Sequence, residues 1–406
     1  MSTTEPTPDA DLLQRLAALA VHAGANVQRG QFVSISAQVG GHEPLARAIA
    51  GAAYAAGARF VDVAWFDPLV KRERLLHSSD EDLDVVPPWL GDRIETLGRE
   101  RAANISLTGQ VRPGVFADID PARVGRDQLP ALKQTAEVIN RRELNWTVVP
   151  APSVGWAQQV FPGLDPAEAL RRLEADIRVV CRLDEPDPVA AWRARSDELQ
   201  ANAERLNARR LDAIRLEGPG TDLTVGLLPS SRFIAAGMDT VGGITHQANV
   251  PTEEVFTTPD PARVDGVVRA TKPLTLGGTT VDGIEVEFRG GEVVRLDATT
   301  GADVMRRWIE RDPGARRLGE LALVDGDGRV GQTGTVFHET LLDENAASHI
   351  ALGSAYLMCL DDEADHPRAN RSAIHVDFMV GSRDVAAIGI AADGTEAPLL
   401  VQGAWQ

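Results

Sequence analysis

Residues 32–65 read FVSISAQVGGHEPLARAIAGAAYAAGARFVDVAW and decide the fold that we expect for the first half of the chain. Two strand-like apolar runs, residues 32–37 and 59–65, flank an alanine-rich segment, residues 42–56, which ends at Gly57. The composition predicts a helix closed by a glycine between two strands. This order is typical of parallel strands that are joined by a crossover helix.

The same alternation continues on both sides of this stretch. The helical patterns are residues 11–23, 88–102 and 128–143, and the strand-like runs that follow the last two are residues 104–108 and 146–149. We therefore predict an α/β N-terminal domain with an open, mostly parallel sheet and helices on both faces. No Gly-x-Gly-x-x-Gly follows the first strand, so only the fold class favours a nucleotide-binding role.

A change of composition near residue 185 predicts a domain boundary. The turn-forming run Asp184-Glu-Pro-Asp-Pro188 precedes a long charged helical pattern, residues 190–210. We therefore divide the chain into an N-terminal domain, residues 1–185, and a catalytic C-terminal domain, residues 186–406. In the second domain we expect antiparallel strands around Gly218-Pro219-Gly220 and Arg289-Gly290-Gly291, and helices near residues 303–312 and 344–357. The predicted class of this domain is α+β.

Charge and hydropathy exclude several kinds of partner. The chain has 406 residues and a net charge of −18, which repels phosphate backbones and anionic lipid surfaces. We therefore expect no nucleic acid and no membrane partner. No apolar run approaches about 18 residues and the N-terminus has no signal-peptide pattern, so we expect a cytoplasmic protein. Cys181 and Cys359 lie in apolar surroundings, and we expect buried, reduced thiols.

Two segments near the C-terminus carry side chains that bind metals. Residues 343–356 read DENAASHIALGSAY, which we interpret as a helix with His349 and Tyr356 two turns apart on one face. Residues 374–378 read IHVDF, which as a strand points His375 and Asp377 to one side. An imidazole and a carboxylate on one face form half of a site for a divalent cation. A solvated strand face is the alternative.

Two acidic sites lie upstream of these segments. The run Asn249-Val-Pro-Thr-Glu-Glu-Val-Phe-Thr257 places Glu253 and Glu254 beside an apolar patch, and Leu318-Gly-Glu-Leu-Ala-Leu-Val324 places Glu320 in an apolar strand. A buried carboxylate is costly unless a cation pairs with it. Glu320 is therefore either a metal ligand or an edge-strand residue that faces water.

Taken together, these motifs resemble the aminopeptidase T family of metallopeptidases, which includes the aminopeptidases S. The resemblance rests on residues 249–257, 318–320, 343–356 and the run His375-Val-Asp-Phe-Met-Val-Gly-Ser382, and it covers the whole chain. One departure is Ser348, where relatives often carry cysteine before the histidine.

The resemblance implies an exopeptidase that removes N-terminal amino acids from peptides, contains two metal ions and is usually a homodimer. The implied metal ligands are Glu254, Glu320, His349, His375 and Asp377, with Glu344 as a further carboxylate, and the implied active-site tyrosine is Tyr356.

The residue types suit this chemistry. Two divalent ions generate a hydroxide at neutral pH and polarise the peptide carbonyl. We expect Glu320 or Glu344 to bridge the ions and Tyr356 to ligate metal or donate to the tetrahedral intermediate. Glu253 is either a residue that holds the substrate's amino group or a solvated surface carboxylate, and we favour the second.

The sequence leaves several alternatives open. Mixed carboxylate and imidazole sites accept zinc, cobalt, manganese or magnesium. Another dinuclear hydrolase, either an amidase or a phosphoesterase, is an alternative reading. A metal-bound but inactive binding protein is a second one, which the intact ligands at every motif argue against.

Overall fold

A computed structural model describes residues 6–130, 132–235, 237–276 and 279–406. The chain forms two compact units. Unit 1 consists of Met1–Arg195 and Gly237–Pro251, and unit 2 consists of Ser196–Ala236 and Thr252–Gln406. Unit 1 thus includes a short stretch from the second half of the chain. The boundary expected near residue 185 stays a prediction; the long charged helix after it is α10, Pro188–Ala208.

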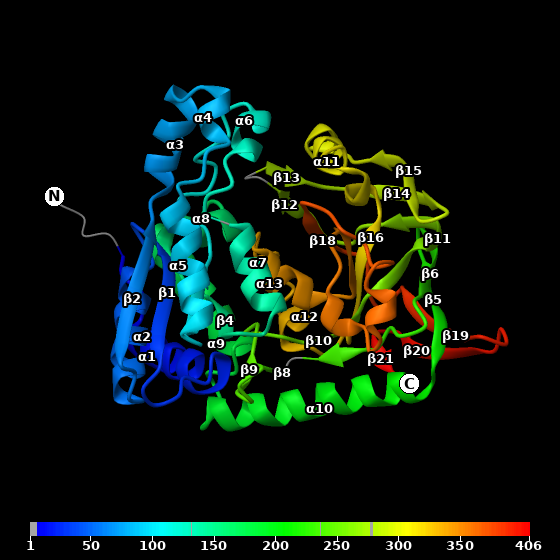
Figure 1. The fold of residues 1–406 in the computed structure, drawn as a ribbon, viewed down its shortest axis with the longest axis horizontal. Coiled ribbons are helices and arrows are strands. Elements are labelled where there is room, and N and C mark those ends of the chain that lie inside the picture. Colours follow the sequence, from blue (N-terminus) through cyan, green and yellow to red (C-terminus); the bar gives the residue numbers. More distant parts are fainter. Residues whose placement is uncertain (1–5, 131, 236, 277–278) are drawn as a thin grey trace. The chain divides into compact units, whose positions relative to one another are not determined.

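Unit 1 contains a four-stranded parallel sheet in the order β2-β1-β3-β4 (Figure 1). Its strands are β1 Phe32–Gln38, β2 Phe60–Phe66, β3 Ala103–Thr108 and β4 Asn145–Pro150. Its helices are α1 Ala10–Leu19, η1 Ala20–Gly24, α2 Glu43–Ala55, α3 Pro68–His77, α4 Asp80–Leu83, α5 Pro88–Arg99, α6 Pro121–Arg126, α7 Lys133–Asn140, α8 Val154–Val160 and α9 Pro166–Val180. The strand-helix alternation that the sequence predicts is therefore confirmed.

Unit 2 is built on two antiparallel sheets. The larger has eight strands in the order β15-β14-β11-β6-β5-β19-β20-β21. They are β5 Leu211–Gly218, β6 Thr221–Leu227, β11 Pro259–Arg269, β14 Glu285–Arg289, β15 Glu292–Asp297, β19 Ala386–Ala391, β20 Glu396–Val401 and β21 Ala404–Trp405. Both glycine turns that were expected to join antiparallel strands do so, between β5 and β6 and between β14 and β15. The α+β class of this half is confirmed.

The smaller sheet of unit 2 has five strands in the order β18-β17-β16-β10-β7. They are β7 Ile234–Ala235, β10 Glu254–Thr257, β16 Leu318–Val324, β17 His349–Gly353 and β18 His375–Met379. Side chains on one face enter the hydrophobic core with those of the larger sheet: Val255, Leu321, Leu323, Ile350, Leu352, Val376 and Phe378. Because strand side chains alternate, the intervening positions project from the opposite face.

Shorter elements complete the described part of the chain. They are β8 Gly237–Asp239, β9 Thr245–Gln247, β12 Leu274–Leu276, β13 Thr279–Val281, α11 Ala302–Ile309, η2 Pro313–Arg316, α12 Arg329–Thr333, α13 Thr340–Asp343, η3 Glu344–Ala346, η4 Leu357–Cys359 and η5 Glu363–Asp365. Cys181 and Cys359 are buried free thiols, as expected. Among the described residues, no helix combines the length and the apolar character that crossing a membrane requires.

The helix predicted over residues 343–356 is wrong. Its first part contains only the end of α13, at Asp343, and the short turn η3, and His349 begins the strand β17. Gly353 has φ +108°, and a Cβ there would lie 2.1 Å from the carbonyl oxygen of Ile374. Every residue of β17 is buried, and all of them except His349 are small or apolar. A short run that is apolar on both faces shows no alternation, so its sequence pattern does not distinguish a strand from a helix.

Candidate metal centre

Five side chains converge on the face of the smaller sheet that lies opposite the core. We call them the ligand cluster: Glu254 of β10, Glu320 of β16, His349 of β17, and His375 and Asp377 of β18. They form two groups, and within each group the potential ligand atoms all lie within 4.8 Å of one another. Glu254, Glu320 and His349 make the first, and Glu320, His375 and Asp377 make the second. Glu320 is therefore common to both.

The strand register explains why these side chains meet. Glu320 on β16 pairs with Ala351 on β17, and Ala351 pairs in turn with Asp377 on β18. Ala322, two residues after Glu320, pairs with His349. The two alanines therefore share a face with the ligands, and their methyl groups leave the space above the sheet in which longer polar side chains converge.

Both imidazoles are held in defined orientations. His349 Nε2 lies 3.1 Å from Glu254 Oε2, and its Nδ1 lies 3.2 Å from the carbonyl oxygen of Ala347. His375 Nε2 lies 3.1 Å from Glu320 Oε2, and its Nδ1 lies 2.7 Å from the carbonyl oxygen of Ser354. A backbone carbonyl that accepts from Nδ1–H leaves Nε2 to bind a cation, as is usual for histidine ligands of metals.

The carboxylates of the cluster require positive charge. Glu254 is 6% exposed, Glu320 4% and Asp377 8%. Glu254 Oε2 and Asp377 Oδ1 are buried, and each faces an imidazole nitrogen: His349 Nε2 lies 3.1 Å from Glu254 Oε2, and His375 Nε2 lies 3.4 Å from Asp377 Oδ1. Because burying carboxylates this close together is costly, divalent cations fit this donor set of carboxylate oxygens and imidazole nitrogens.

The pKa values describe the same strongly negative environment. Burial lowers the pKa of His349, but the hydrogen bond and charge of Glu254 outweigh it and raise this pKa to about 10. Burial raises the pKa of Glu320, and the charges of Asp377 and Glu254 raise it further against the opposing effect of His375. The protonated imidazole is stabilised here because its positive charge offsets the negative charge of the carboxylates, as a bound metal cation would.

Tyr356 lies beside the cluster although it does not lie on a helix with His349. Its ring centroid is 4.9 Å from that of His375 and 5.8 Å from that of Phe256. Burial, followed by the charges of Glu320 and Asp377, raises the pKa of the phenol well above its usual value. The phenol therefore keeps its proton near neutral pH and is a hydrogen-bond donor.

Glu344 lies in the field of the cluster but belongs to neither ligand group. Burial raises its pKa well above the usual value, and repulsion from Asp377 and Glu254 adds to the effect. Its role as a ligand stays a prediction.

Glu253 and Glu320 are both buried, whereas the sequence analysis favoured a solvated Glu253 and left a water-facing Glu320 open. Glu253 is fully buried, so the expected solvated surface carboxylate is wrong. Its backbone N–H donates to Asn345 Oδ1 at 2.6 Å. Glu320 lies on the central strand of the smaller sheet, so the edge-strand alternative is also wrong.

Two asparagines support the site, and the sequence analysis did not identify them. Asn345 is fully buried, and besides accepting from Glu253 it donates to the carbonyl oxygen of Leu341. Asn370 donates to the carbonyl oxygen of Gly353 at the end of β17, at 2.7 Å. The position of Asn345 inside the motif of residues 343–356 was the available signal for it, whereas no local pattern distinguishes Asn370.

Comparison with known proteins agrees with this geometry. Residues 9–405 match the family described as thermophilic metalloprotease (M29). Aminopeptidase T of Thermus thermophilus is 43% identical over 401 residues, which cover 97% of this chain and 98% of that protein. Aminopeptidase AmpS of Bacillus subtilis is 37% identical over 403 residues, with the same coverage. The solved structure of wild-type AmpT from Thermus thermophilus superposes with a TM-score of 0.90 at 42% identity, covering 97% of this chain and 98% of that one.

Proposed function

Since the chain belongs to the thermophilic metalloprotease (M29) family and is a metal-dependent aminopeptidase, we propose that the ligand cluster is its catalytic centre. The observation that carries this proposal is the position of Glu320 in both ligand groups. A carboxylate shared by two groups suits two divalent ions with one bridging ligand. The alternative amidase or phosphoesterase activity is not favoured, because the relatives from Thermus thermophilus and Bacillus subtilis are both aminopeptidases by name.

Each side chain of the cluster has a proposed role. Divalent ions, when bound, lower the pKa of a water molecule toward about 7 and polarise the peptide carbonyl. Glu254 and His349 would hold one ion, His375 and Asp377 would hold the other, and Glu320, which belongs to both ligand groups, would be shared between them. Glu344 is proposed as an additional carboxylate contact.

Tyr356 is proposed to act on the substrate. Its protonated phenol, next to the His375 ring, donates a hydrogen bond to the oxygen that gains negative charge as the peptide carbon becomes tetrahedral. A donor that is already held beside the reacting group stabilises the transition state without reorganisation. This role requires no change in the protonation of Tyr356 during the reaction.

The decisive experiment combines metal analysis with a substrate panel. We expect about two equivalents of a divalent metal (zinc, cobalt, manganese or magnesium) per chain, and hydrolysis of aminoacyl anilides with a free amino group. The N-acetylated anilides and phosphate monoesters serve as matched non-substrates. Cleavage of a phosphate ester at the rate of the best anilide would contradict the assignment, and a single tightly bound metal would contradict the bridging role of Glu320.

We also propose that the enzyme is a homodimer in the cytoplasm. The resemblance to the aminopeptidase T family supports the dimer, and β2 at the edge of the sheet of unit 1 carries the exposed aromatic residues Phe60 and Trp65. Light scattering after size-exclusion chromatography should give twice the chain mass, 43.5 kDa. Fractionation of cells should recover the aminopeptidase activity with cytoplasmic markers, and recovery with secreted or membrane markers would contradict this localisation.

A further inference from the structure

Tyr356 is carried by the connection between β17 and β18, residues 354–374, which we call the tyrosine segment. Most of this segment is irregular: it contains the two short turns η4 and η5, and an isolated bridge pairs Leu360 with Ser231. Its two ends are fixed by the sheet, because Ser354 N–H donates to the carbonyl oxygen of Ile374 at 2.7 Å. The position of the phenol therefore depends on what holds the middle of the segment.

One anchor acts directly on Tyr356. Thr258 is fully buried, and its Oγ1 donates to the carbonyl oxygen of Tyr356 at 2.7 Å. Thr258 directly follows β10, the strand that begins with Glu254. The segment of chain that supplies one carboxylate of the ligand cluster thus also contacts the backbone of the tyrosine.

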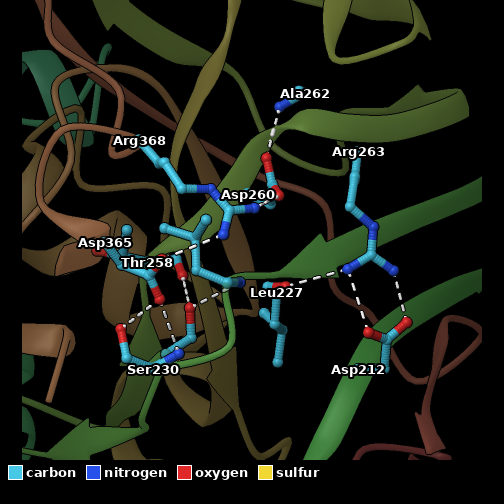
Figure 2. A network of polar contacts seen from close by, with 11 residues as sticks. Asp212, Leu227, Ser230, Thr258, Asp260, Ala262, Arg263, Asp365 and Arg368 are labelled. Carbon is cyan, nitrogen blue, oxygen red and sulfur yellow. Dashed lines mark hydrogen bonds and ion pairs between the residues drawn. The ribbon is translucent and has the colours of Figure 1, made fainter. Parts of the chain in front are cut away.

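A second anchor lies farther along the segment (Figure 2). Arg368 Nη2 donates to Asp260 Oδ2 at 2.8 Å, and Arg368 Nη1 donates to Asp365 Oδ1 at 3.1 Å. The other oxygen of Asp365 accepts from both Oγ and N–H of Ser230, at 2.7 and 3.1 Å. Asp260 is only 4% exposed and lies two residues after Thr258, so both anchors meet the segment from the same stretch of chain.

We propose that Thr258 and the Asp260–Arg368 pair are positioning residues that hold the phenol of Tyr356 at the ligand cluster. The proposal rests on the proposed role of Tyr356. A hydrogen bond from the buried Thr258 hydroxyl and a charge-assisted bond from the half-exposed Arg368 to the buried Asp260 hold a segment that otherwise has little regular structure. Displacement of a catalytic group by about 1 Å can cost about 100-fold in rate, so anchors that touch neither metal nor substrate are able to control kcat.

The variants follow from these contacts. Thr258→Val removes the hydroxyl donor with little change of volume, and we expect kcat to fall about 10- to 100-fold with KM and metal content unchanged. Thr258→Ser keeps a hydroxyl and should recover most of the loss. Arg368→Gln, at a half-exposed position, should fold normally and lower kcat by about 10-fold.

Arg263→Gln is the matched control. Arg263 is as exposed as Arg368, at 45% against 49% for the side chains, and it makes an ion pair with Asp212 in the same region (Figure 2). It also donates to the carbonyl oxygen of Leu227, and neither partner belongs to the tyrosine segment. We expect this variant to retain wild-type kcat.

A second readout does not depend on activity. The chain has two tyrosines, so 3-fluorotyrosine labelling gives two fluorine resonances, and Tyr54→Phe assigns them. In metal-free protein, Thr258→Val and Arg368→Gln should shift or broaden the Tyr356 resonance, whereas Arg263→Gln should leave it in place. An unchanged Tyr356 resonance in both anchor variants would overturn the proposal.

A double-mutant cycle distinguishes this inference from the function on which it rests. If Thr258 acts through the phenol, Thr258→Val should cost no further kcat in a Tyr356→Phe background. Additive losses would overturn the positioning role and leave the role of Tyr356 intact. If Tyr356→Phe instead retains wild-type kcat, the catalytic role of Tyr356 is refuted, and the positioning role that depends on it is refuted as well.

Discussion

Replacement of Glu320 by glutamine is the sharpest test of the ligand cluster. The amide has the shape of the carboxylate but lacks its charge, so the change isolates electrostatics at the one residue that both ligand groups share. Two unit charges about 4 Å apart have an interaction energy of about 4 kcal/mol at an effective dielectric constant of about 20. A dication attracts the carboxylate twice as strongly, but the neutral amide of glutamine costs less free energy to bury than a carboxylate, and this offsets part of the loss. We therefore expect a loss near 4 kcal/mol, or about 10³-fold in Kd for the metal.

The same substitution should leave the metal-free fold intact. The pKa of Glu320 is raised, which means that the ionised form is disfavoured where it lies and that a neutral amide is tolerated. We expect the unfolding temperature of the metal-free variant to stay within about 2 °C of the wild type, since less than about 1 kcal/mol is at stake.

The assay is metal content after dialysis against metal buffers, measured by mass spectrometry and compared with kcat. Glu174→Gln in unit 1 is a matched control, because Glu174 is also a buried glutamate, at 9% exposure. Both metals at full occupancy in Glu320→Gln, with wild-type kcat, would refute the reasoning.

Three further predictions concern the metals, Tyr356 and His42. Chelation should abolish activity, and added cobalt or zinc should restore it; full turnover in excess chelator, with no metal detectable, would exclude a metal mechanism. Tyr356→Phe should lower kcat by about 10²- to 10³-fold and cost at most about 1 kcal/mol of stability, as steady-state kinetics and thermal unfolding can show. His42 accepts from Gln38 N–H at Nδ1 and lies 2.9 Å from Gly109 O at Nε2, so the neutral ring fits, and burial lowers its pKa from 6.5 to about 4. Because the unfolded chain binds this proton more readily, the stability from His42 is present above pH 6.5 and is lost as the pH falls toward 4; between pH 7 and 5.5 the loss is about 1 kcal/mol. Denaturant unfolding at both pH values should show a smaller difference in His42→Gln, and an unchanged difference would argue against this linkage.

The sequence predicted the elements whose patterns are local. The strands around residues 32–65 and the antiparallel pairs around the glycine turns have distinct apolar runs and turn residues, and they are confirmed. The family and the aminopeptidase activity are also confirmed, because several motifs in the right order are specific together.

The features that depend on long-range pairing could not be predicted. Residues 349–353 were assigned to a helix because a strand buried on both faces shows no alternation. The convergence of Glu254 with His349 arises from the register of β10, β16 and β17, which are distant in sequence. Glu253 was expected in solvent because its burial is provided by segments that its own neighbours in the chain do not reveal.

The smaller sheet has its apolar core on one face and its metal ligands on the other, and this separation affects how the metal ions exchange. In small zinc domains the ion supplies the folding free energy, so the free ligands exist only in an unfolded chain. Here the face that carries Leu321, Ile350 and Phe378 has its own apolar core, and backbone hydrogen bonds join the strands that carry the ligands. Ion binding then does not have to repay the entropy of chain ordering. We expect the enzyme to exchange one divalent ion for another in its folded state, so that the ion it contains in a cell follows the relative supply of competing metals.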